Sequence, residues 1–446
     1  MRDRDGAAAA DLVLRGGVVH TFAGGGPASA LAVRGGRIVT VGGDAEVGDL
    51  VGADTEVVDL AGRCVLPGIN DAHLHGLWLG ALWPDTLFGG GGLDRTGPLV
   101  TTAEQRRAAI GRAGEICAAL GITSYTEPGL GPGEDHGATG CFGQSALADY
   151  VALADGGRLR QRVTALRLFG KLDGPSACAD LLAGIATPSP RAADPRRFRV
   201  AGVKIFADGI PPMHSAWLHE PYCGGGYGGL LVEGRDDAER ERNLRAMIGA
   251  AARAGLQVGV HVTGDRAIDV VVDALVSSGR VAGRHYLIHG DLVAPETLRR
   301  MSAAGIGLTV QPAIARVTAD MMRSAVGPRV TEAWPLRAML DAGVPLTISS
   351  DAPVVDPDWR RQLAAAGELL GVTGVDGHLV HRLLAGYTRE PAVLDRAEGW
   401  KGTVAAGCVA DLCVLGADPL RMPLAELPDV PVVATLLGGR LTHGAL

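Results

Sequence analysis

Eight short runs of apolar and β-branched residues follow one another along the chain, and a helical pattern separates most of them. A strand–helix alternation repeated this often is typical of a parallel (β/α)8 barrel, the TIM barrel. A doubly wound open sheet is the alternative, but it would not bring residues from its first, fifth, sixth and eighth strands to one point. The sequence therefore predicts an α/β fold built on a barrel, with strands near residues 64–66, 121–125, 163–168, 200–206, 257–262, 286–289, 306–310 and 345–349.

Four of the intervening helices have clear end signals. Each is followed by a glycine, the residue that most often occupies the left-handed position after a helix. The first also begins with Thr101-x-x-Glu104, the pattern of a capping box. These predicted helices cover residues 103–120, 236–254, 295–304 and 333–342.

The two ends of the chain show a different pattern. Apolar and polar residues alternate over 11–22, 30–41 and 56–60, and again over 410–415 and 432–441. Short alternating strands between glycine turns are typical of small β-sandwiches. Neither end has enough apolar residues for a core of its own. We therefore expect residues 1–62 and 403–446 to form one composite β-sandwich domain beside a barrel of residues 63–402.

The composition excludes several function classes. The 446-residue chain has a net charge of −7 and no basic stripe for nucleic acid, and no apolar run reaches the ~18 residues of a membrane span. Its seven cysteines include no CxxC pair, which suggests reduced thiols and a cytoplasmic location. We expect a cytoplasmic enzyme with a small-molecule substrate and no nucleic-acid or membrane partner. A homo-oligomer is compatible with the sequence.

Two histidines, His73 and His75, follow the first predicted strand at positions i and i+2. In an extended chain such residues point to the same side, so both imidazoles can reach one ion. Imidazole is the commonest protein ligand of zinc and similar metals. An isolated pair of this kind is as often an ordinary turn or surface feature, so the interpretation depends on further donors elsewhere.

Further donor side chains lie at the carboxyl ends of later strands, the end at which barrel enzymes place their active sites. The four histidines and one aspartate among them can supply ligands for one zinc ion and most of a second, and another divalent metal would suit the same donors. Any one of them alone could be a satisfied core or surface residue, but their convergence predicts a metal site. The strand-end residues are His73, His75, Glu127, Lys204, His261, His289, Gln311 and Asp351.

Lys204 lies in an otherwise apolar strand, where a bare ammonium is costly to bury. One interpretation is an ion pair with Asp208 or Glu127. The other is carbamylation by CO₂, which turns the amine into a carboxylate able to bridge two metals. Burial beside cations favours the neutral amine that this chemistry needs, so we favour a carboxylated lysine.

The segment 209–234, after the fourth strand, is long for a barrel connection and contains His214, Trp217 and Tyr222 among prolines and glycines. This mixture suits a lid over the substrate, and packing within the loop is the alternative. The predicted substrate contacts are these three residues and Gln311. Three arginines after the seventh strand could hold a substrate carboxylate or simply be solvated: Arg316, Arg323 and Arg329.

The ordered set of motifs resembles the amidohydrolase superfamily, in particular its branch of YtcJ-like proteins and N-substituted formamide deformylases. The similarity covers nearly the whole chain. It implies a (β/α)8 barrel with an appended β-sandwich, one or two bound divalent metals, usually zinc, and a proton-transfer role for Asp351. The resembling motifs are Pro67-Gly68-x-x-Asp71-x-His73-x-His75, Val203-Lys204-Ile205-Phe206-Ala207-Asp208-Gly209, His261-x-x-Gly264-Asp265-Arg266-Ala267, His289, Val310-Gln311-Pro312, Ser349-Ser350-Asp351-Ala352-Pro353 and Gly407-x-x-Ala410-Asp411-Leu412.

The expected activity is hydrolysis of a C–N bond in an amide, formamide or cyclic amide. Zinc would supply hydroxide at neutral pH and polarise the scissile carbonyl, and Asp351 would act as general base and then as general acid toward the leaving nitrogen. Metal ligands do not encode the bond that is broken. A decarboxylase or isomerase on the same scaffold, or a catalytically silent metal-binding protein, is therefore the alternative.

Overall fold

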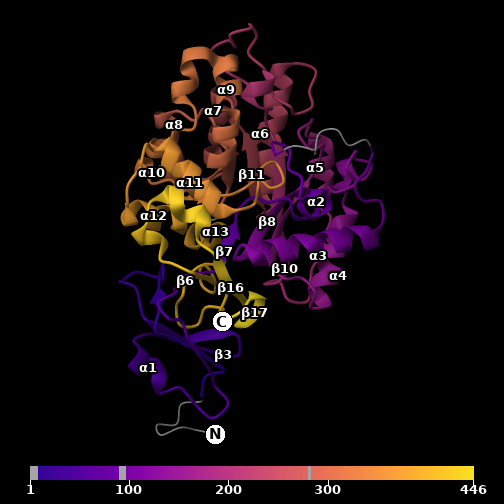
Figure 1. The fold of residues 1–446 in the computed structure, drawn as a ribbon. Coiled ribbons are helices and arrows are strands. Elements are labelled where there is room, and N and C mark those ends of the chain that lie inside the picture. Colours follow the sequence, from indigo (N-terminus) through magenta and orange to yellow (C-terminus); the bar gives the residue numbers. More distant parts are fainter. Residues whose placement is uncertain (1–8, 90–96, 280–282) are drawn as a thin grey trace.

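A computed structural model describes residues 9–89, 97–279 and 283–446. Within these residues, eight strands form one parallel sheet in chain order, and it is nearly closed (Figure 1). At the seam, the N–H of Asp351, just after the last strand, donates to the carbonyl of His73, just after the first, at 2.8 Å. The predicted mixed α/β fold is thus confirmed. The strands are β7 (Ile69–Asp71), β8 (Ile122–Leu130), β9 (Arg162–Leu168), β10 (Phe198–Phe206), β11 (Gln257–Val262), β12 (Tyr286–His289), β13 (Gly307–Val310) and β14 (Leu346–Ile348).

Most helices lie around this sheet, whereas the first helix of the chain lies beside the small sheet near the N-terminus (Figure 1). No helix in the described part of the chain is both long and apolar enough to span a bilayer. The helices are α1 (Asp44–Gly48), α2 (Gly76–Leu82), α3 (Ala103–Ala119), α4 (Ser145–Asp155), α5 (Cys178–Gly184), α6 (Asp237–Arg253), α7 (Asp265–Ser277), α8 (Pro295–Ala304), α9 (Pro312–Val326), α10 (Leu336–Ala342), α11 (Trp359–Leu369), α12 (Gly377–Ala385) and α13 (Arg389–Leu394).

The first predicted barrel strand is wrong. The run Cys64–Leu66 forms β6 (Cys64–Pro67), which pairs with strands near both chain ends instead of joining the parallel sheet. The chain changes sheets at Gly68. Glycine is required at this point, because a Cβ would lie 2.1 Å from the Thr123 hydroxyl oxygen. The parallel sheet therefore begins at β7, which is too short to show a strand pattern of its own.

One helix cap and one helix start also differ from the prediction. The capping box of α3 is formed one residue later than expected: Thr102 Oγ1 accepts the N–H of Gln105, whose side chain accepts the N–H of Thr102. Helix α10 begins at Leu336, not at residue 333, because Pro335 precedes it and a 3-10 turn occupies Gly327–Glu332. Proline disfavours helical geometry in the residue before it.

The chain ends build two smaller sheets, within the described residues. One has four strands in the order β4-β3-β1-β5, and the other has five in the order β17-β16-β15-β6-β2. Apolar residues from both share one core, including Leu14 and Val33 of the first sheet and Val65, Leu412 and Leu436 of the second. These strands are β1 (Leu12–Arg15), β2 (Val18–Val19), β3 (Ala30–Arg34), β4 (Arg37–Gly42), β5 (Glu56–Asp59), β15 (Leu412–Leu415), β16 (Val432–Leu437) and β17 (Arg440–Gly444).

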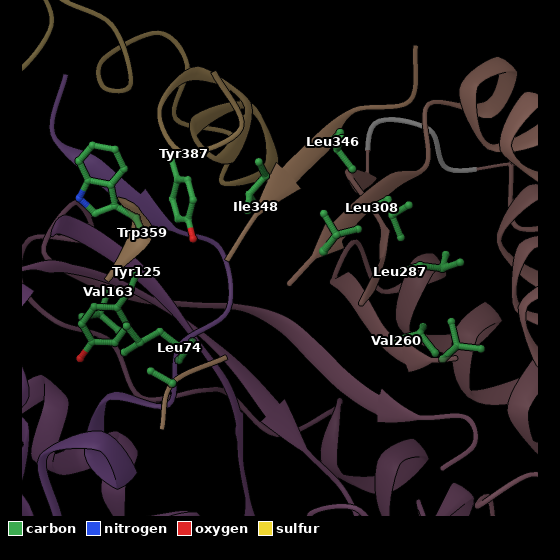
Figure 2. Close-up of a cluster of buried hydrophobic side chains, with 14 of the residues drawn as sticks. Leu74, Tyr125, Val163, Val260, Leu287, Leu308, Leu346, Ile348, Trp359 and Tyr387 are labelled. Carbon is green, nitrogen blue, oxygen red and sulfur yellow. The ribbon is translucent and has the colours of Figure 1, made fainter. Parts of the chain in front are cut away.

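The largest core surrounds the parallel sheet. Val260, Leu287, Leu308 and Leu346 come from four consecutive strands and lie along the sheet in Figure 2. Burying each such side chain contributes about 2 kcal/mol. Trp359 is fully buried at the start of α11, and its indole N–H donates to the carbonyl of Leu120 at 2.7 Å. This core fixes the strands whose carboxyl ends carry the predicted site.

Candidate metal centre

His73, His75 and Asp351 meet at the carboxyl ends of β7 and β14. Asp351 Oδ1 lies 3.1 Å from His73 Nε2 and 3.3 Å from His75 Nε2. One ligand atom from each of the three residues falls within 4.8 Å of the others. All three side chains are buried. The three residues therefore form a compact, buried cluster of two imidazoles and one carboxylate.

His261 and His289 extend this cluster from β11 and β12. The ring centroids of His73 and His289 are 5.7 Å apart, and those of His289 and His261 are 4.6 Å apart. His289 and Asp351 have φ values of 75° and 57°. Non-glycine residues in this left-handed region are strained, by about 1–3 kcal/mol each, and such strain concentrates at functional sites.

Hydrogen bonds from outside the cluster orient the two later histidines. His289 Nδ1 lies 2.7 Å from Gln311 Oε1, and the amide nitrogen of Gln311 donates to Ser349 Oγ at 2.8 Å. His261 Nε2 lies 3.2 Å from the carbonyl oxygen of Gly209. Both ends of the Gln311 amide are thus engaged by the protein, so its structural role is to position His289. Its contact with a substrate stays a prediction.

The donor set fits a divalent cation. His73 Nδ1 and His75 Nδ1 are buried and have no hydrogen-bond partner among the described residues, and a buried unsatisfied polar atom costs about 1–3 kcal/mol. Burial lowers the pKa of His75, but the nearby carboxylates of Asp351 and Glu127 outweigh it and raise that pKa to about 9. Imidazole and carboxylate groups at this spacing are the ligands that zinc-like metals take.

Asp351 is held in its ionised form. Burial opposes ionisation, but the charge of His73 and hydrogen bonds to His73 and His75 keep the pKa of this carboxyl well below its ordinary value. A buried carboxylate that is ionised at neutral pH can both ligate a cation and accept a proton.

Lys204 lies on β10 with only 1% of its surface exposed. It makes no ion pair with any residue that the structure describes, and its Nζ lies 4.7 Å from the ring centroid of Phe206. Burial lowers its pKa to about 8, although Asp351 and Asp173 oppose that shift. The neutral amine is therefore more accessible than it is in an exposed lysine.

Both of the alternative ion-pair partners of Lys204 are occupied elsewhere. Asp208 accepts the backbone N–H groups of Trp217, Thr263 and Gly264 at 2.9–3.0 Å. Glu127 accepts the hydroxyl of Tyr150 at 2.6 Å and the N–H of Leu77 at 3.2 Å. The ion-pair interpretation is therefore wrong for this structure.

The sequence did not reveal how Asp71 and Glu127 support the cluster. Asp71 accepts the N–H groups of His73 and Ser350, at 3.1–3.2 Å, and so joins the ends of β7 and β14. Glu127 Oε1 lies 3.7 Å from His75 Nδ1. Asp71 lies two residues before the His73-x-His75 pair, and this spacing is a signal that the sequence offers. The contact of Glu127 with Tyr150 joins separate segments and has no local sequence signal.

The loop after β10 is more tightly packed than an open lid. Trp217 and Tyr222 are each 3% exposed, with the Arg266 guanidinium 4.1 Å from the Trp217 ring and the Tyr222 hydroxyl bonded to the Ala216 carbonyl. His214 is exposed, has a φ of 55° and stacks on Tyr222 at 4.7 Å. Substrate contact by these residues stays a prediction, for which His214 is the accessible candidate.

The three arginines proposed for a substrate carboxylate pair with acidic residues instead. Arg316 lies 3.4 Å from Glu368, Arg323 lies 2.7 Å from Asp320, and Arg329 contacts Glu220 at 3.6 Å. The first two are largely exposed. Arg316 and Arg323 therefore fit the interpretation that they are solvated. Arg329 instead contacts the loop after β10 through Glu220.

A family model described as the amidohydrolase family matches residues 87–443. The chain belongs to the amidohydrolase family. It is accordingly a hydrolase that acts on carbon–nitrogen bonds, as the sequence motifs predicted.

Individual relatives of this amidohydrolase are distant. It is 29% identical over 260 residues to YtcJ of Bacillus subtilis, a match that covers 54% of this chain and 46% of YtcJ, so it spans about half of that relative. It is 24% identical over 526 residues to N-substituted formamide deformylase of Arthrobacter pascens, covering 93% of this chain and 95% of the relative. An uncharacterized metal-dependent hydrolase from Pyrococcus furiosus shares the fold, with a TM-score of 0.73, 22% identity and coverage of 92% and 100%.

Proposed function

We propose that this amidohydrolase is a zinc-dependent enzyme that cleaves the C–N bond of a small amide, formamide or cyclic amide. The observation that carries the proposal is the buried cluster of His73, His75 and Asp351, in which one ligand atom of each residue lies within 4.8 Å of the others. The relative from Arthrobacter pascens, named as a formamide deformylase and matched almost end to end, supports the substrate class.

His73, His75 and Asp351 would hold the first metal, because their donor atoms already converge. His261, His289 and a carbamylated Lys204 would supply the ligands of a second, since these side chains adjoin the cluster. A bound divalent metal lowers the pKa of a coordinated water and polarises a carbonyl. Imidazole is the dominant donor, which suits zinc among the borderline divalent metals, and zinc is the ion that we propose.

Side chains of the protein would then transfer the proton, position a metal ligand and contact the substrate. Asp351 would accept a proton during attack on the carbonyl and return it to the leaving nitrogen. Its low pKa keeps the carboxylate ionised and so available as the base before the attack. Gln311 holds the imidazole ring of His289 through a hydrogen bond, so that the ring does not rotate during the reaction. His214 would contact the substrate from the loop after β10.

We also propose the finer architecture that the sequence predicted. The parallel sheet closes into a full (β/α)8 barrel, supported by the hydrogen bonds that join the ends of β7 and β14. The two smaller sheets stack as one β-sandwich domain made from both chain ends, supported by their shared core. The cytoplasmic location stays a prediction, supported by all seven cysteines being free thiols in the described residues.

The metal assignment can be tested by elemental analysis. Changing His73 and His75 together to alanine should remove at least one equivalent of zinc from the purified protein, because two of the three converging donors are lost. The matched control is His378→Ala with His443→Ala, two exposed histidines far from the cluster. Equal metal content in both double variants would contradict the assignment.

The carbamate on Lys204 can be tested separately. A crystal structure of the metal-loaded enzyme should show additional density on Nζ, and Lys204→Ala should lose activity that added short carboxylates partly restore. Lys171→Ala, at an exposed lysine, should keep its activity and show no such response. An unmodified ammonium in the metal-loaded enzyme would instead indicate a mononuclear site.

The bond that is cleaved needs a product assay. Incubation of the metal-loaded enzyme with a panel of N-substituted formamides, acyclic amides and cyclic amides should release an amine or open the ring. Release of CO₂ from a carboxylate substrate without amine release would favour a decarboxylase on the same scaffold. Metal binding with no turnover on the whole panel would favour the silent alternative.

A further inference from the structure

A second concave site lies at the opposite end of the parallel strands from the metal centre. Its volume is about 1010 Å³, and in the described residues its lining contains eight arginines but only two acidic residues, Glu115 and Asp194. It lies where the starts of β4 and β17 face the barrel, at Arg37 and Arg440. We call it the arginine groove.

Half of these arginines have carboxylate partners. Arg107 pairs with Asp149 at 2.8 Å and Arg162 with Asp411 at 2.6 Å, both buried carboxylates outside the lining. Arg160 and Arg196 pair with the two acidic lining residues, at 3.6 Å and 3.2 Å. Eight arginines less these four leave four positive charges without a carboxylate partner.

The four uncompensated arginines are Arg37, Arg158, Arg197 and Arg440, and none forms an ion pair with a residue that the structure describes. Arg37 and Arg197 donate to the carbonyl oxygens of Gly407 and Leu159. Arg158 and Arg440 are exposed. The chain as a whole has a net charge of −7, so the groove is a positively charged region on a negatively charged protein. Like charges gathered in a concave surface raise the local potential and attract anions.

We infer that the arginine groove binds a small anion carrying several phosphate groups. Guanidinium groups present planar pairs of donors that match phosphate oxygens. The groove's size is at the upper end of the ~300–1000 Å³ range of small-molecule sites. No aromatic side chain is among its described lining residues, so it offers no ring on which a nucleobase could stack. Recognition therefore rests on the phosphates, whether these belong to inorganic oligophosphate or to a phosphorylated metabolite.

The position of the groove gives binding a structural consequence. Arg440 and Arg37 come from the sheets built by the chain ends, and Arg158 and Arg197 come from segments flanking α4 and β10. An anion held by all four bridges these two regions. A ligand that binds only the folded state raises its stability, so bound oligophosphate should raise the melting temperature.

The test is isothermal titration of the full-length, metal-loaded enzyme with tripolyphosphate at low ionic strength. The wild type should bind one equivalent, with affinity that falls as salt is added, because salt screens exposed charges. Arg158→Glu with Arg440→Glu should weaken binding and so raise the dissociation constant by about tenfold or more. The control is Arg242→Glu with Arg337→Glu, two exposed arginines on α6 and α10 that change the net charge equally. It should bind as the wild type does, and any heat from metal chelation is common to both variants.

The competing outcomes are distinct. Absence of saturable binding by the wild type, or equal weakening in both double variants, would overturn the inference. ATP binding about tenfold more tightly than tripolyphosphate would show that a base is recognised, and preferential binding of a single-stranded oligonucleotide would show a nucleic-acid site instead; either overturns the phosphate-only assignment. Should the glutamate variant fail to fold by its melting curve, Arg158→Gln with Arg440→Gln provides the same comparison with a smaller expected loss.

Discussion

Asp351→Asn should retain metal while its turnover falls by roughly 10²-fold or more, the scale of losing a general acid–base group. Asparagine keeps the shape and one oxygen donor toward His73 and His75 but cannot accept the proton. It also tolerates the left-handed backbone of this position, where φ is 57°. The measurements are zinc content by elemental analysis and the turnover number on the amide substrate found in the panel.

The matched control for this prediction is Asp356→Asn, in the same loop. Asp356 Oδ1 accepts the N–H of Asp358 at 2.8 Å, and the asparagine oxygen can accept the same bond, so activity should be unchanged. A near wild-type rate for Asp351→Asn would show that the proposed proton transfer is wrong. Loss of zinc together with activity would instead make Asp351 chiefly a ligand.

Asp411→Ala should lower the free energy of unfolding by about 3–5 kcal/mol, because it leaves a buried arginine unpaired. Asp411 accepts two hydrogen bonds from Arg162, at 2.6 and 3.0 Å, and a third from the N–H of Gly438 at 2.8 Å. The side chains of Arg162 and Asp411 are only 8% and 6% exposed. Chemical denaturation followed by circular dichroism measures the loss.

Two comparisons separate this effect from general damage. Glu115→Ala breaks the exposed pair with Arg160, and should cost at most about 1 kcal/mol. Arg162→Met with Asp411→Leu removes both buried charges and should be less destabilising than Asp411→Ala alone. If Asp411→Ala costs no more than Glu115→Ala, the buried pair does not stabilise the junction between the sheets.

Several elements could be predicted because their signals are local. The runs that became β11 and β12, and helix α8 with its initial Pro295 and final Gly305, have the predicted bounds. Donor residues were located by a topological rule, that the carboxyl ends of parallel strands meet at one face. That rule needs the order of the strands and not their coordinates, which is why His73, His261 and Asp351 could be placed near one another from sequence.

The errors arose where distant segments decide the outcome. Cys64–Leu66 has the composition of a barrel strand, but its partner is β15, whose pairing with it joins residues more than three hundred positions apart along the chain. The contacts of Glu127 with Tyr150, 23 positions apart, and of Arg162 with Asp411, 249 positions apart, also depend on separate segments. No local sequence pattern distinguishes a residue that has a distant partner from a residue that has none. Only the packed structure therefore shows which residues make these contacts.

The seam between β7 and β14 also has a consequence for how the enzyme matures. His75 and Asp351 stand at opposite ends of the barrel sequence, and the Asp71 carboxylate and the N–H of Asp351 close the seam beside them. During synthesis the two histidines emerge early, but they acquire their carboxylate only after every intervening strand has been made. A metal ion bound there would join the ends of the first and last strands and so hold the sheet closed. Hydrogen exchange at the amides of Ser350 and Asp351, faster in the metal-free protein than in the loaded one, would record that closure.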